Sequence, residues 1–74
     1  MILGITGNTL KEGMWEPVAS LIKDLRSIHN KFVVHPDLAK GLLDRDASLQ
    51  DNEIARTVLD FLDQAELIIS FGGD

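Results

Sequence analysis

The stretch Leu67-Ile68-Ile69-Ser70-Phe71-Gly72-Gly73-Asp74 determines the fold class of this 74-residue sequence, because it joins an apolar run directly to a glycine turn. A short apolar run that ends in a turn is typical of a strand buried on both faces of a parallel sheet. We therefore predict a strand over 67–71 whose carboxyl end passes into Gly72-Gly73.

Two earlier segments have the same character. The apolar run Ile2–Thr6 ends in Gly7-Asn8, which predicts a first buried strand followed by a turn. The run Lys31–His35 ends at Pro36, a residue that cannot donate to a ladder and disfavours helix in the residue before it. These segments are the predicted first and second strands.

Helical spacing separates the three strands. Apolar residues recur at steps of three and four along the first connection, so we predict a regular helix from near Glu16, with Pro17 in its first turn. The second connection predicts a short helix over Asp37–Leu43 that Gly41 interrupts, then an exposed loop. It continues with a helix that Asp51 or Asn52 caps. The apolar face of this last helix comprises Ile54, Val58, Phe61 and Leu62.

The element order β-α-β-α-β predicts an α/β fold with a parallel sheet and right-handed crossovers. We expect one unit over residues 1–74, the three-layer half of a doubly wound, Rossmann-like sheet. Chains of this size bury only about 60% of their unfolded surface, so stability should be low. If further strands normally cover the strand over 67–71, its free edge should promote self-association.

Composition excludes several classes of function. A net charge of -5 with scattered basic residues argues against a nucleic-acid partner, and two histidines without cysteine are too few for a metal cluster. No apolar stretch approaches the roughly 18 residues that span a bilayer, and the N-terminus lacks the features of a signal peptide. We therefore expect a cytoplasmic protein without a membrane partner.

The candidate site lies where the first and third predicted strands end. Ligands of open parallel sheets bind beyond the carboxyl ends of the strands, so Gly7, Asn8, Gly72 and Gly73 are candidate substrate-binding residues. Glycines at such turns let the backbone approach a phosphate. Asp74 follows them and is the candidate catalytic residue, either accepting a proton from an attacking hydroxyl or holding a metal ion between phosphates.

The same residues also suit plain turns, and the general nucleotide-binding motifs are missing. The sequence Gly4-Ile5-Thr6-Gly7-Asn8-Thr9 does not fit the six-residue glycine pattern of dinucleotide-binding proteins, and no P-loop occurs. From chemistry alone, Gly72-Gly73-Asp74 is either a ligand-facing strand exit or a turn that only lets the chain leave the sheet.

Two quoted stretches resemble the bacterial NAD kinases, whose superfamily carries a Gly-Gly-Asp-Gly-Thr signature. They are Ile2-Leu3-Gly4-Ile5-Thr6-Gly7-Asn8 and Gln64-Ala65-Glu66-Leu67-Ile68-Ile69-Ser70-Phe71-Gly72-Gly73-Asp74. The resemblance implies transfer of a phosphoryl group from ATP or polyphosphate to the 2′-hydroxyl of the adenosine ribose of NAD, which gives NADP. It further implies that Asp74 is the general base and that Gly72 and Gly73 leave room for nucleotide phosphates.

The resemblance also implies partners and limits. NAD and ATP would be the ligands, Mg²⁺ or another divalent cation would accompany the donor, and the full-length enzyme would be a homodimer or homotetramer. The chain ends before the Gly-Thr of the signature and lacks the family's β-rich C-terminal domain. It therefore resembles an N-terminal portion that is inactive alone. Alternatives are a lipid or sugar kinase of the same superfamily and a non-catalytic α/β interaction module.

Overall fold

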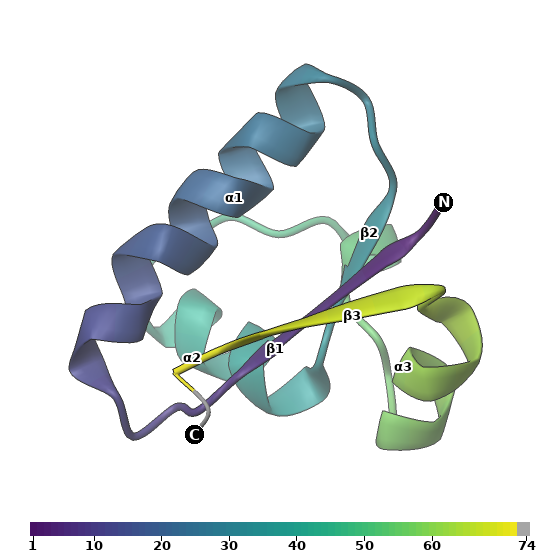
Figure 1. Cartoon of the computed structure of the whole chain (residues 1–74). Helices are drawn as coiled ribbons and strands as arrows, with labels where there is room; N and C mark the ends of the chain where they lie inside the picture. The colour runs from purple at the N-terminus through teal and green to yellow at the C-terminus, as the bar shows by residue number, and fades with distance from the viewer. Residues whose placement is uncertain (73–74) are drawn as a thin grey trace.

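A computed structural model describes residues 1–72, and its three-stranded sheet confirms the predicted α/β class (Figure 1). The elements in chain order are β1 (Leu3–Gly7), the 3-10 turn η1 (Glu12–Met14), α1 (Trp15–Ser27), β2 (Phe32–Val34), α2 (Pro36–Asp44), the 3-10 turn η2 (Asp51–Glu53), α3 (Val58–Gln64) and β3 (Leu67–Phe71). The strands are parallel in the order β2-β1-β3, which is compatible with a small Rossmann-like half-fold. The predicted site residues Gly73 and Asp74 lie outside the described residues.

Helices cover the two faces of the sheet, as Figure 1 shows for α1 and α3. The larger core lies on the α1 side, where Ile5 of β1 and Val34 of β2 pack with the buried faces of α1 and α2. A smaller core on the other side contains Val33 of β2 and Phe61 of α3. Successive side chains of β2 thus point to opposite cores, which is the alternation expected of a strand buried on both faces.

Gly4 allows α3 to approach β1 closely. A Cβ atom at this position would lie 2.5 Å from the Cβ of Ala65 and 3.0 Å from the ring of Phe61. Any larger residue would push α3 away from the central strand, so glycine here follows from packing.

The prediction that Gly41 interrupts a short helix was wrong. Helix α2 runs without a break from Pro36 to Asp44. The ring of Trp15 lies directly over Gly41, where a Cβ atom would overlap it, and the guanidinium carbon of Arg45 lies 3.7 Å from the ring centroid. Glycine destabilises the interior of a helix, but at this position its missing side chain allows close contact between α1 and α2.

The predicted cap and start of the last helix were also wrong. Asp51–Glu53 forms only the 3-10 turn η2, and Ile54 then takes an extended conformation beside Val34. Helix α3 begins at Val58, where the Oγ1 of Thr57 accepts a hydrogen bond from the amide of Asp60 (3.1 Å). The backbone of residues 54–55 is bonded to the end of β2, since the amide of Ala55 donates to the carbonyl of Val34, so it cannot join a helix.

Burial of α3 and β3 is lower than the sequence predicted. Of the expected apolar face of the last helix, Phe61 is only 2% exposed. Val58 is 50% exposed and Leu62 is 54% exposed. In β3, expected to be buried on both faces, Leu67 is 51% exposed and Ile68 is 43% exposed. The reason is position: α3 contacts β1 and β2, whereas β3 is an edge strand of the sheet that residues 1–72 form.

Candidate functional site

The structure brings the carboxyl ends of β1 and β3 together, as the site prediction requires. Gly7 is in register with Phe71, and the amide of Asn8 donates a hydrogen bond to the carbonyl of Phe71 (2.8 Å). Gly72 follows directly, so three of the five predicted site residues meet at one edge of the sheet. Gly73 and Asp74 lie beyond the described residues.

Gly7 has a packing role that is independent of any ligand. A Cβ atom here would lie 2.9 Å from the carbonyl oxygen of Phe71 and would also overlap the sulfur of Met14. The methionine side chain can move, but the backbone carbonyl of the paired strand cannot move without distorting the sheet. The pairing of β1 with β3 thus accounts for the glycine.

Asn8 closes the turn that leads out of β1. Its Oδ1 accepts a hydrogen bond from the amide of Leu10 (3.0 Å), and its carbonyl accepts one from the amide of Lys11 (3.0 Å). This is the local turn that asparagine side chains favour. Within residues 1–72 the Nδ2 group of Asn8 makes no hydrogen bond. The Nδ2 group is therefore available to a ligand, whereas Oδ1 is already bonded to the amide of Leu10.

Gly72 adopts a conformation that favours glycine, with a φ of 65°. An ideal Cβ on Gly72 would lie 3.3 Å from the Cβ of Lys11. The exit from β3 is therefore packed against the loop that follows β1. The positive φ of Gly72 thus occurs where β1 and β3 end, beside the loop that follows β1.

Lys11 is a candidate that the sequence analysis missed. It is exposed, it flanks Gly72, and its ammonium group forms no ion pair with the described part of the chain. A cation at the carboxyl edge of a parallel sheet can neutralise a bound phosphate. The available signal was a basic residue four positions after Gly7, in the loop between a strand and a helix.

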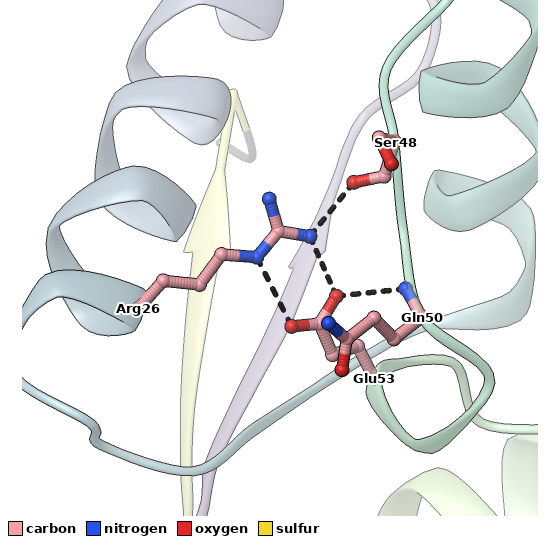
Figure 2. A network of polar contacts seen from close by, with 4 residues as sticks. All are labelled: Arg26, Ser48, Gln50 and Glu53. Atoms are coloured by element: carbon pink, nitrogen blue, oxygen red, sulfur yellow. Dashed lines mark hydrogen bonds and ion pairs between the residues drawn. The ribbon is translucent and has the colours of Figure 1, made fainter.

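The best-formed polar network lies elsewhere and is structural. Figure 2 shows Arg26 of α1 reaching across to Glu53 of η2 and to the carbonyl of Ser48. The guanidinium donates two hydrogen bonds to the carboxylate, Nε to Oε2 (3.0 Å) and Nη2 to Oε1 (2.6 Å). The amide of Gln50 donates a further bond to Oε1 (2.9 Å). This network fastens the segment between α2 and α3 to α1.

The Arg26 network lowers the pKa of Glu53. The hydrogen bonds from Arg26 are the largest cause, burial of the carboxyl group opposes them, and the bond from Gln50 adds to the lowering. Because the pKa of Glu53 is lower in the folded state, its ionised carboxylate stabilises the fold at pH values above the ordinary glutamate pKa of about 4.3. This stabilisation is lost as the pH falls through the pKa that Glu53 has in the folded state. The Glu53 side chain is only 10% exposed, which limits hydration of the charge.

We therefore expect Glu53→Gln to lower the free energy of unfolding by about 1–3 kcal/mol at pH 7 and by less near pH 3. Urea unfolding followed by circular dichroism at both pH values measures the difference. Asp63→Asn, an exposed carboxylate in α3, is the matched control and should change little at either pH. An equal loss for Glu53→Gln at pH 3 and pH 7 would contradict the charge-based explanation.

A depression lies at the opposite edge of the sheet. Its volume is about 580 Å³, and its walls include Ile2, Lys31 and Gln64, which precede the three strands, together with the Arg26–Glu53 pair. This amino-terminal edge is the one that ligands of open parallel sheets do not usually occupy.

The described residues contain no group of three or more histidines or carboxylates that could hold a metal ion. The implied divalent cation therefore has no cage of side chains in residues 1–72 and would depend on donor phosphates, as Mg²⁺ commonly does. No helix in the described part of the chain has both the length and the apolar character needed to cross a membrane.

Comparisons with known protein families, with characterised proteins and with solved structures found no match to this chain. The placement of the residues is thus the basis for any statement about function.

Proposed function

We propose that this chain is the N-terminal portion of an NAD kinase, in which the carboxyl edge of β1 and β3 forms one wall of the phosphoryl-transfer site. The observation that carries the proposal is the arrangement of Gly72. Its left-handed turn at the exit of β3 lies against Lys11, in the loop that follows Gly7 and Asn8. This is the edge at which parallel α/β sheets bind nucleotides.

Each residue then has a defined part in the reaction. Gly72 and Gly73 leave room for phosphate groups, and the free Nδ2 of Asn8 can donate to a phosphate or a ribose hydroxyl. Lys11 offsets the negative charge of the donor. The 2′-oxygen of the adenosine ribose attacks the terminal phosphorus of ATP, its proton passes to Asp74, and the bond to the leaving oxygen of ADP breaks.

The divalent cation contributes charge neutralisation on the donor phosphates. In this proposal the chain's own contribution is to position the donor and, through Asp74, to accept the proton. Residues 1–74 alone contain only one side of this arrangement, and we expect them to be inactive.

The test is to express the complete open reading frame that encodes this chain and to measure NADP formation from NAD with ATP or polyphosphate. We expect NADP with at least one donor and none from residues 1–74 alone. Parallel reactions with diacylglycerol and with a sugar phosphate as acceptors separate the related kinases. A phosphorylated lipid or sugar without NADP would overturn the NAD assignment and keep the phosphoryl-transfer chemistry.

A non-catalytic interaction module is the second candidate, and one observation favours it. Packing against Phe71 explains Gly7, and the turn to Leu10 explains the Asn8 side-chain oxygen, so neither needs a ligand. If the folded full-length protein forms no product with NAD, diacylglycerol or the sugar phosphate, this candidate is supported over the NAD, lipid and sugar kinases.

A further inference from the structure

A pocket at the amino-terminal edge of the sheet has no part in the proposed reaction. It is the depression of about 580 Å³ described above, and we call it the amino-edge pocket. Its walls come from the segments that precede β1 and β2, from the ends of α1 and α3, and from η2. A volume of this size is typical of a site for a small organic molecule.

The amino-edge pocket lies at the other end of the strands from the exit of β3. The chain leaves β3 at Gly72, on the carboxyl edge, whereas Ile2, Lys31 and Gln64 lie where the strands begin (Figure 1). The strand whose outer side lacks a partner within residues 1–72 is β3, and it contributes no residue to the walls. The pocket is therefore formed by contacts within residues 1–72 and does not depend on the open side of β3.

The charge of the pocket walls is opposite in sign to the charge of the chain. The chain has a net charge of -5, yet Arg26 and Lys31 line the pocket together with a single carboxylate, that of Glu53. His29 adds a third basic side chain to the walls. The pocket is thus a basic region of an acidic protein, which favours a negatively charged ligand.

The carboxylate of Glu53 cannot cancel these cations, because it is already paired. Both of its oxygens accept hydrogen bonds from Arg26, and Oε1 also accepts one from the amide of Gln50. The Nη1 group of Arg26 makes no hydrogen bond within residues 1–72 (Figure 2). The ammonium group of Lys31 forms no ion pair with the same part of the chain. Lys31 therefore carries an uncompensated charge, and Arg26 keeps donors for a ligand.

The carboxyl end of α1 offers little opposition to an anion. Free carbonyls at a helix end carry partial negative charge. Here the amides of residues 28–30 donate hydrogen bonds to the carbonyls of residues 24–26, so these carbonyls are occupied. This closure places His29 in the left-handed region, with a φ of 57°, where glycine is the usual residue. The end of α1 thus brings a basic side chain to the pocket in place of a row of free carbonyls.

We propose that the amino-edge pocket binds a small organic molecule with at least two negative charges, carried by phosphate or carboxylate groups. Lys31 and the free Nη1 of Arg26 bind the charged groups through charge-assisted hydrogen bonds. The side-chain amides of Asn52 and Gln64 line the pocket and make no hydrogen bond within residues 1–72, so they can donate to the rest of the molecule. The inference is independent of the proposed kinase function, since the two sites lie at opposite edges of the sheet.

Calorimetric titration of the full-length protein with pyrophosphate and with citrate tests the proposal, at an ionic strength held constant with sodium chloride. Pyrophosphate carries only phosphate groups and citrate only carboxylates, so the pair distinguishes the two sources of charge. We expect saturable binding of at least one probe. Lys31→Gln should weaken this binding about tenfold to a hundredfold, the usual effect of losing a charge-assisted hydrogen bond. Binding of neither probe to the folded protein would overturn the proposal.

Lys23→Gln is the matched control, because it makes the same change of charge at an exposed position of α1 outside the pocket walls. It should bind the probe as the wild type does. Pyrophosphate could also bind beside Lys11 at the carboxyl edge, so the difference between the two variants is what locates the anion. Equal affinities of Lys31→Gln and Lys23→Gln would place the anion elsewhere and overturn the proposal.

Nuclear magnetic resonance gives a second and independent test of the location. Saturation with the bound probe should shift the signals of the Arg26 side chain and of the Gln64 side-chain amide in the wild type. The same concentration should shift them much less in Lys31→Gln. Unchanged Arg26 and Gln64 signals in the wild type, under conditions where calorimetry shows binding, would exclude the amino-edge pocket as the site.

Discussion

Phe61→Ala is expected to lower the free energy of unfolding of this chain by about 3–5 kcal/mol, which is the usual cost of removing a buried aromatic side chain. Phe61 is the only residue of α3 that is fully buried, and its ring fills the space that Gly4 leaves between α3 and β1. Its ring also meets the ring of His35 edge to face, with the centroids 5.3 Å apart. No other side chain of α3 can replace these contacts.

The effect should be large relative to the total stability, because small domains are stabilised by only about 5–15 kcal/mol. We expect Phe61→Ala to be largely unfolded at 37 °C, measured by urea titration or thermal melting with circular dichroism. Leu59→Ala is the matched control in the same helix. Leu59 is 74% exposed, so its removal should cost less than about 0.5 kcal/mol. Equal losses for the two variants would show that α3 is not anchored by Phe61.

The second large effect follows from the proposed NAD kinase function. Asp74→Asn should reduce the rate of NADP formation by about 10²–10⁴-fold, the usual contribution of a general base. Asparagine has the size of aspartate but cannot accept the proton of the 2′-hydroxyl. The KM for NAD should change little, because the same volume remains at the site.

Asp63→Asn is the control, since its carboxylate is exposed in α3 and removed from the carboxyl edge of the sheet. It should leave the rate unchanged. Full activity in Asp74→Asn would exclude Asp74 as the base. The metal-holding role, which the chemistry allows equally, predicts instead that a high Mg²⁺ concentration restores part of the lost rate, so a Mg²⁺ titration of the variant separates the two.

The sequence predicted the two strand exits that make up the candidate site, because both depend on local rules. The glycine turn after 67–71 and the turn after the first strand follow from short-range conformational preferences. That the two turns meet follows from the parallel order of the elements. Lys11 could not be ranked above other exposed lysines, because its proximity to Gly72 depends on how two loops distant in sequence pack together.

The failed predictions of secondary structure concern the second connection, and each has a tertiary cause. Gly41 continues a helix because the Trp15 ring occupies the space of its side chain. Ile54 is extended because the amide of the next residue, Ala55, is hydrogen-bonded to β2. Helix α3 therefore begins only after Thr57, which caps it. Glu53, which follows the predicted caps Asp51 and Asn52, lies in the turn η2 and pairs with Arg26.

The amino-acid sequence by itself determined the α/β class, the parallel direction of the strands and the position of the strand exits, because periodicity and turn chemistry act between neighbours in the chain. Only the tertiary structure decided which apolar residues are buried. The spacing of Val58, Leu62, Leu67 and Ile68 matches that of core residues, yet these side chains are exposed, because α3 contacts β1 and β2 and β3 is an edge strand within residues 1–72. Burial depends on what lies opposite a face, and that is set by the arrangement of the elements in space.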